Sequence, residues 1–252
     1  MTKKIVLAIL LLVSFGPHSC LRQGDVGAAP ISAFPESMGA KVVVHLDVND
    51  VNDSPKLVEW GKTAKTLIEE WHQRTANLIP TKGFNPPTEV WLKIRKSNRG
   101  VAGTSGGHIT VSSGWIEKHP EDLGCVHHEL VHVIQDYKER RVPGWVTEGI
   151  ADYLRWGIYD GKPLDWFPFS DKPQGYKDSY RVTGGFFLWL ESDVCPGIVN
   201  KLNTAIRKRS YADETWFEKQ TGRTIDSLWA DYIKDRKKSE PGQVETKQDI
   251  KN

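Results

Sequence analysis

A mainly apolar stretch in the middle of the chain, residues 126–134, contains two histidines four residues apart, with a glutamate directly after the first. Residues four apart lie one turn above each other on a helix, so His128 and His132 can present both imidazoles to one metal ion. Glu129 follows on the same helix, where its carboxylate can take a proton from water that zinc activates. His127 is rotated by about 100° and should face elsewhere. The alternative is a core helix whose histidines only make hydrogen bonds.

A catalytic zinc ion usually takes three protein ligands, so a third one is needed. Glu148 is the candidate, because the Pro-Gly turn at 143–144 would fold the next predicted helix, 145–156, back beside the first. Asp152 lies one turn beyond Glu148 and can accept the free ring N–H of a zinc-bound histidine. Gly149 would let the two helices approach closely. The competing interpretation is a solvated acidic face, which the apolar residues of this helix disfavour.

Strand patterns in the first half of the chain and helical patterns in the second predict an α+β fold with a small mixed or antiparallel sheet. Strands are predicted at 41–48, 88–94 and 107–113, the last two being separated by a Gly-rich turn at 100–107. A long amphipathic helix should begin at the Ser54-Pro55 pair and end near Leu78. Later helices are predicted at 120–137, 145–156, 180–191, 198–208, 212–220 and 225–235. Together these elements predict a single folded domain over residues 41–236.

The first residues have the pattern of an export signal. Two lysines precede an apolar run from Ile5 to Phe15 that is too short to span a bilayer comfortably, which predicts a signal peptide at residues 1–20. Cys20 ends a sequence similar to a bacterial lipobox, so a lipid anchor at Cys20 is one alternative, and cleavage nearer residues 26–28 is the other. The protein is therefore expected to be secreted, or to lie in the periplasm or cell envelope.

Two further segments lack the periodicity of a folded domain. Residues 21–40 are rich in Gly, Ala, Pro and Ser and predict a flexible linker, whereas residues 237–252 are polar and predict a disordered tail. Beyond the leader no apolar segment is able to cross a membrane, so no transmembrane span is expected in the mature chain.

Two cysteines, Cys125 and Cys195, remain after removal of the signal peptide. In an oxidising compartment they can form one disulfide, and two buried thiols are an equal alternative, because spacing in sequence does not reveal distance in space.

The charge balance argues against nucleic acid as a partner. The chain has 34 basic and 32 acidic residues, a net charge of +2, so composition predicts no basic footprint for a phosphate backbone. It also contains neither a Walker-type loop nor a Gly-x-Ser-x-Gly elbow, which disfavours nucleotide and serine-hydrolase chemistry. We expect a monomer.

Several strings of residues match one known pattern. They are His128–Gln135, Pro143–Trp145, Thr147–Arg155, Ser179–Leu188 and Ile225–Tyr232. Together they resemble the plant and bacterial basic secretory protein family, a set of secreted metallopeptidases, over about residues 41–235. The two histidines with Glu148 and Asp152 are similar to the gluzincin pattern, in which a glutamate completes the zinc site.

The resemblance implies a zincin-like fold and a zinc-dependent metallopeptidase that acts on peptide or protein substrates. Glu129 would be its general base, and we expect Tyr180, with Tyr153 behind it, to stabilise the oxyanion. The alternative for Tyr180 is an aromatic residue packed in the core. The third predicted strand, 107–113, would form the edge along which an extended peptide pairs.

Two other functions stay open at this point. One is a zinc amidase that acts on cell-wall cross-links, and the other is a secreted binding or defence protein that keeps zinc for structure alone.

Overall fold

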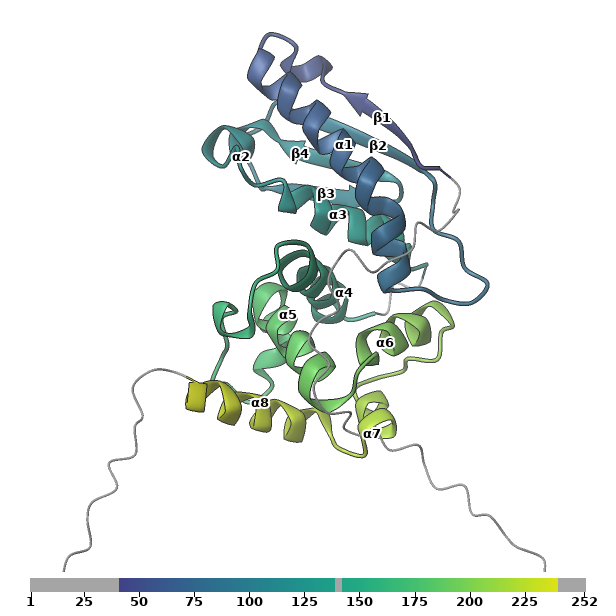
Figure 1. Cartoon of the computed structure of the whole chain (residues 1–252), viewed down its shortest axis with the longest axis vertical. Helices are drawn as coiled ribbons and strands as arrows, with labels where there is room; N and C mark the ends of the chain where they lie inside the picture. The colour runs from purple at the N-terminus through teal and green to yellow at the C-terminus, as the bar shows by residue number, and fades with distance from the viewer. Residues whose placement is uncertain (1–40, 139–141, 240–252) are drawn as a thin grey trace, which may run out of the picture.

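The computed structural model describes residues 41–138 and 142–239, which form an α+β fold (Figure 1). Its strands are β1 (Val43–Asp47), β2 (Glu89–Arg95), β3 (Ala102–Ser105) and β4 (His108–Ser112). Its α-helices are α1 (Pro55–Leu78), α2 (Ser113–Lys118), α3 (Gly124–Gln135), α4 (Gly144–Asp152), α5 (Tyr180–Trp189), α6 (Ile198–Arg207), α7 (Thr215–Thr221) and α8 (Ile225–Ser239). The sheet, α1, α2 and α3 lie in one half of the molecule, and α4 to α8 lie in the other. The predicted α+β class is confirmed.

The four strands form one mixed sheet in the order β1-β2-β4-β3. Strands β1, β2 and β4 are parallel, and β3 pairs antiparallel with β4 through the two-residue turn Gly106–Gly107. Gly106 has a φ of 60°, a left-handed conformation that such tight hairpins need and that glycine adopts without strain. The three predicted strands correspond to β1, β2 and β4.

The edge of the sheet differs from the prediction. The sequence predicts 107–113 as the edge strand, but β4 lies between β2 and β3, so β3 forms this edge. β3 occupies part of the stretch predicted as a Gly-rich turn. Its residues Ala-Gly-Thr-Ser are small and have a weak strand preference, and pairing with β4 is what holds them extended.

Helix α1 packs its apolar side against one face of the sheet (Figure 1). Ala64 and Ile68 of α1 are fully buried, as are Val90, Leu92 and Ile94 on alternate positions of β2. Burial of each large aliphatic side chain contributes about 1.5–3 kcal/mol to the stability of the fold. The contact between α1 and the sheet is therefore the core of the sheet half.

The helix with the two histidines starts later than predicted. A separate short helix, α2, follows β4 directly, and α3 begins at Gly124 rather than near Pro120. Asp122 defines this start, because its carboxylate accepts a hydrogen bond from the backbone N–H of Cys125 at 3.1 Å, one of the free N–H groups at a helix start. At the other end Asp136 takes a left-handed conformation with a φ of 39°, which ends α3.

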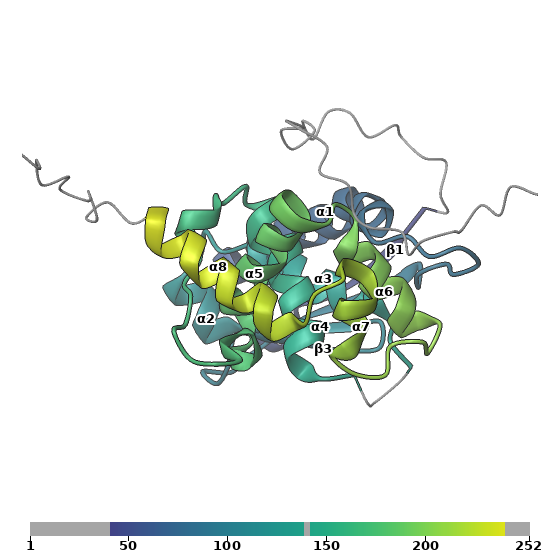
Figure 2. The ribbon, with the colours of Figure 1, turned by 90° about the horizontal axis from the view of Figure 1, so that it is seen from below.

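Aromatic side chains build the core of the helical half. Phe186 of α5 lies 5.2 Å from Trp229 and 5.5 Å from Tyr232 of α8, measured between ring centroids. Helix α8 therefore packs along α5 and lies across the outside of this half (Figure 2). Large buried rings contribute much apolar area each, and this contact holds α5 in place.

Arg207, the last residue of α6, ties the two halves together. Its guanidinium donates to the carbonyl oxygen of Ile79 at 2.8 Å and to that of Ile134 at 2.6 Å. These carbonyls lie at the C-terminal ends of α1 and α3, where helix carbonyls lack partners within the helix. A cation at this position also matches the negative ends of both helix dipoles.

Gly149 allows a close helix contact, but with a different partner from the one predicted. The sequence predicts that it lets α4 approach α3, whereas it faces α5. A Cβ atom added at Gly149 would lie 2.9 Å from the Cβ of Thr183 and 3.0 Å from the ring of Phe187. The glycine therefore sets the spacing between α4 and α5.

Other features of the chain can be placed only in part. The predicted signal peptide, the lipid anchor at Cys20 and the linker at 21–40 lie outside the described residues. The first residues of the predicted tail, 237–239, belong to the end of α8, and the rest of it lies outside the described residues. Among the described residues, no helix combines the length and the apolar character needed to cross a membrane.

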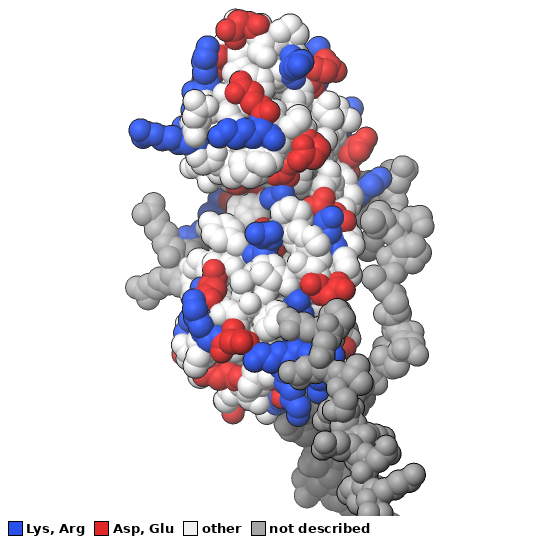
Figure 3. Space-filling view, turned by 90° about the vertical axis from the view of Figure 1, so that its left-hand side faces the viewer, with Lys and Arg blue, Asp and Glu red and all other residues white. Residues whose placement is uncertain are grey.

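On the face shown in Figure 3, basic and acidic side chains are interspersed.

Gly149→Ala is expected to lower the free energy of unfolding by about 1–3 kcal/mol, because the added methyl group overpacks the α4–α5 contact. Urea denaturation followed by tryptophan fluorescence measures this change. Gly144→Ala is the matched control on the same helix, since its added Cβ would meet nothing within 4 Å. Equal losses in the two variants would contradict the close contact.

Candidate metal centre

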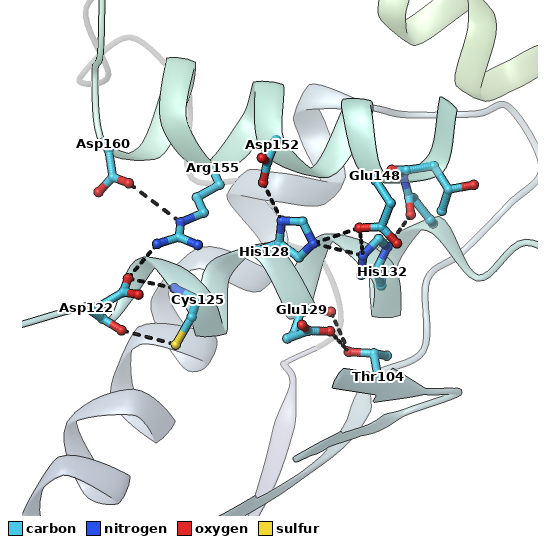
Figure 4. Close-up of polar contacts among 12 residues, drawn as sticks. Thr104, Asp122, Cys125, His128, Glu129, His132, Glu148, Asp152, Arg155 and Asp160 are labelled. Atoms are coloured by element: carbon cyan, nitrogen blue, oxygen red, sulfur yellow. Dashed lines mark hydrogen bonds and ion pairs between the residues drawn. The ribbon is translucent and has the colours of Figure 1, made fainter. Parts of the chain in front are cut away.

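The side chains of α3 and α4 bring three donor atoms to one point (Figure 4). The Nε2 atom of His128 lies 3.1 Å from Nε2 of His132 and 3.1 Å from Oε2 of Glu148. Nε2 of His132 lies 3.4 Å from the same carboxylate oxygen. The structure therefore brings together the three ligands predicted from sequence.

The geometry of this triangle fits a zinc ion. Ligand bonds of about 2.0–2.1 Å in a tetrahedral site hold the ligand atoms about 3.3–3.4 Å apart. The three observed distances, from 3.1 to 3.4 Å, are close to that spacing. Two imidazole nitrogens and one carboxylate oxygen are also a donor set that zinc takes in hydrolases.

Each histidine is held by a hydrogen bond at its other ring nitrogen. The Nδ1–H of His128 donates to Oδ1 of Asp152 at 2.7 Å, as predicted from the spacing of Glu148 and Asp152. The Nδ1–H of His132 donates to Oε1 of Gln135, also at 2.7 Å. These contacts direct both Nε2 atoms toward Glu148 and set the tautomers that a metal ion needs.

Gln135 is a site residue that the sequence reasoning misses. Its amide nitrogen donates to the carbonyl oxygen of Thr147 at 3.0 Å, so its amide oxygen is the atom that faces His132. Gln135 thus links the histidine on α3 to the backbone of α4. Gln135 follows His132 by three residues and therefore lies on the same face of the helix. This spacing is the sequence feature that indicates a contact between the two side chains.

The charges of the cluster favour an ion-paired state when no metal is bound. Burial lowers the pKa of His128, but hydrogen bonds to Asp152 and Glu148 outweigh it and raise that pKa to about 9. Burial raises the pKa of Glu148, but hydrogen bonds from His128 and His132 outweigh it and lower that pKa to about 2. A bound metal ion would replace the proton of His128, so metal binding is expected to release a proton.

Glu129 lies beside the cluster and faces the sheet edge (Figure 4). Its carboxylate Oε2 accepts a hydrogen bond from the hydroxyl of Thr104 at 2.7 Å. Thr104 belongs to β3. The sequence predicts a turn in this segment, so it does not indicate that Thr104 orients Glu129. Glu129 is buried, with 7% of its surface exposed, and it lines the same cavity as the three ligands.

His127 lies on the other side of α3, away from the cluster. Its Nε2 atom is 3.2 Å from the hydroxyl of Thr75 on α1, and its ring stacks 4.6 Å from that of Tyr159. Burial lowers the pKa of His127 to about 3, so the ring is neutral. Tyr159 ends a π-helical segment, Tyr153–Tyr159, that continues α4.

The predicted disulfide between Cys125 and Cys195 is not formed. Cys125 is a free, buried thiol whose S–H donates to the carbonyl oxygen of Asp122 at 3.1 Å. Burial raises the pKa of this thiol to about 12, which makes it a poor nucleophile. The alternative of a buried thiol therefore holds for Cys125.

A cavity of about 1150 Å³ opens over the cluster, between β3, α3, α4 and the start of α5. Tyr180, at the start of α5, lines it with its ring 6.4 Å from that of His128, between centroids. The side chain is 57% exposed, so it is not packed in the core as the alternative for Tyr180 supposed. Tyr153, the second candidate, is not among the lining residues.

Comparison with known families decides the broad identity. A family model described as BSP, peptidase of plants and bacteria, matches residues 51–232. The chain belongs to this family. The match to these peptidases includes every residue of the cluster and confirms the resemblance to the basic secretory proteins. No match was found among curated proteins or among solved structures.

Gln135→Ala is expected to weaken Zn²⁺ binding by this peptidase about 10–100-fold, because the ring of His132 loses its partner. Competition with a chelator of known affinity measures the dissociation constant. Gln73→Ala removes a glutamine on α1 that bonds to Asn77, and it serves as the control. An unchanged dissociation constant in Gln135→Ala would contradict the orienting role.

Proposed function

We propose that the protein is an exported zinc-dependent peptidase that hydrolyses internal peptide bonds in peptide or protein substrates. The convergence of His128, His132 and Glu148 at zinc-ligand spacing is the observation that carries this proposal. A glutamate beside them, a cavity of substrate size and membership of a peptidase family support it. The small mixed sheet that leads into α3 supports a zincin-like fold.

Three side chains would hold the zinc ion: His128 and His132 through Nε2, and Glu148 through its carboxylate. When bound, zinc supplies a Lewis acid that polarises a carbonyl group and acidifies water. Asp152 and Gln135 keep the two imidazoles oriented for this task. All five residues lie on α3 and α4, so the packing of these two helices determines the site.

Glu129 is the proposed general base. It takes a proton from the attacking water and returns it to the leaving amine, which a carboxylate can do only when it is positioned within hydrogen-bond reach. The hydrogen bond from Thr104 restricts its side chain to one side of the cavity.

Strand β3 is the proposed binding edge for the substrate backbone. It is an edge strand of the sheet, and its residues Ala102, Gly103 and Thr104 line the cavity. An unpaired strand edge offers N–H and C=O groups to which an extended peptide can add as a further strand. The same strand would thus bind the substrate and orient Glu129 through Thr104.

Tyr180 is proposed to donate a hydrogen bond to the oxyanion that forms during peptide hydrolysis. Its exposed side chain at the cavity and its ring near His128 support this role. The backbone of Tyr180 has a φ of 47°, a left-handed conformation that is costly for a residue with a side chain and that is often found at functional sites.

Export is proposed on the sequence pattern of residues 1–20 and on the family. A signal peptide would deliver the folded domain outside the cytoplasm, with or without a lipid on Cys20.

Glu129→Gln is expected to retain one equivalent of zinc and to lose peptidase activity by at least about 100-fold, because the amide cannot accept the proton. His132→Ala should lose the metal, since only two ligands remain. Metal analysis of the purified proteins and digestion of a mixed peptide library measure both effects.

The same experiment separates the alternatives. Cleavage by Glu129→Gln at the wild-type rate would contradict the general-base role, and a full equivalent of zinc in His132→Ala would contradict the ligand set. Zinc binding without cleavage of any peptide by the wild type favours the binding or defence protein. Hydrolysis of cell-wall cross-links but not of peptides favours the amidase.

Tyr180→Phe is expected to lower kcat by about 100-fold or more with little change in KM, because the hydroxyl donates only to the transition state. Steady-state kinetics on one cleaved peptide measure the two constants. Tyr159→Phe, remote from the cavity lining, is the control. A rise in KM alone would assign Tyr180 to substrate binding instead.

A further inference from the structure

Three cationic side chains line the cavity among the residues that the structure describes: Lys138, Arg155 and Arg181. Two of them are already paired. Lys138 lies 2.6 Å from a carboxylate oxygen of Asp136, and Arg155 lies 2.6 Å from one of Asp122. No carboxylate in residues 41–138 and 142–239 forms an ion pair with Arg181. The cavity therefore presents one cation whose charge is not compensated within this part of the chain.

The carboxylates nearest the cluster have partners of their own. Glu148 contacts both histidines, Asp152 accepts from His128, and Glu129 accepts from Thr104. None of these carboxylates forms an ion pair with Arg181, and an exposed guanidinium in a cleft can meet an incoming anion.

An aromatic wall supports the side chain of Arg181. Its guanidinium carbon lies 5.6 Å from the ring centroid of Trp166, and this ring lies 4.6 Å from that of Trp156. Trp156 also lines the cavity. Contact with an aromatic face restrains a long side chain while its N–H donors remain available at the edges.

The position of Arg181 limits where an anion can bind. It follows Tyr180 directly, and the ring of Tyr180 faces His128 of the metal cluster. Consecutive Cα atoms are about 3.8 Å apart, and an extended substrate advances about 3.3 Å per residue. Arg181 and the metal cluster line one cavity, so a group held by Arg181 would lie in the same cavity as the reacting bond, a few residues from it at most.

We propose that Arg181 binds a carboxylate of the substrate, so that the enzyme selects peptides with an acidic group within a few residues of the cleaved bond. This inference rests on the proposed peptidase function. Two sources supply the same chemistry: an Asp or Glu side chain, and the α-carboxylate at the end of a peptide. Both offer two oxygens to the planar guanidinium fork.

The experiment compares four peptides that share one cleavable core. One has Glu near the bond and an amidated end, one has Gln and an amidated end, one has Gln and a free carboxylate two residues from the bond, and one has both acidic groups. The wild type is expected to cleave the acidic peptides about tenfold faster in kcat/KM than the neutral one, which corresponds to one charge-assisted contact.

Variants assign the preference to one side chain. Arg181→Gln should remove it, and Arg181→Glu should reverse it toward a Lys-containing peptide. Lys138→Gln is the matched control, because Lys138 lines the same cavity but is already paired with Asp136. It should keep the preference. Because Arg181 is exposed, the melting temperatures of its variants should match that of the wild type.

Binding measured without turnover separates this inference from the proposed function. Fluorescence anisotropy of the labelled peptides with Glu129→Gln protein should show tighter binding of acidic peptides, and the added Arg181→Gln change should abolish the difference. Equal binding and equal cleavage of all four peptides would overturn the role of Arg181 while the peptidase function stands. Selective binding without cleavage by the wild type would support Arg181 and contradict the peptidase function.

Discussion

The site depends on two hydrogen bonds that imidazole Nδ1–H groups donate, one from His128 to Asp152 and one from His132 to Gln135. Each bond holds a ring in the orientation that turns its Nε2 atom toward Glu148. A buried ring nitrogen without a partner is costly, so these contacts stabilise the fold and organise the site at once. Because Asp152 lies on α4 and Gln135 contacts the backbone of α4, the cluster exists only while α3 and α4 stay packed.

Each half of the molecule contributes a different part of the site. The sheet half supplies α3 and, through Thr104 on β3, the orientation of Glu129. The helical half supplies Glu148, Asp152 and Tyr180, and its spacing is set by the close approach of α4 to α5. Arg207 joins the halves by binding carbonyls at the ends of α1 and α3. The cavity over the cluster lies where these contributions meet.

The chain is a member of a peptidase family, and its geometry explains how such an activity can arise from a small set of side chains. Three donors at zinc-ligand spacing, a carboxylate beside them and the edge strand β3 are the parts that the proposed zinc-dependent hydrolysis would use. Arg181 adds a positive charge to the cavity and has no role in the proposed hydrolysis step. Selectivity for an acidic substrate would thus come from a residue next to the site rather than from the site itself.

The sequence by itself determined the features that depend on local spacing. Helical periodicity placed His128, Glu129 and His132 on one helix, the four-residue interval paired Glu148 with Asp152, and β-branched runs identified three of the four strands. Tertiary structure alone decided β3, the contacts of Thr104 and Gln135, the free thiol of Cys125 and the helix that Gly149 faces. These depend on contacts between segments distant in sequence or on side-chain orientations, and periodicity carries no information about either.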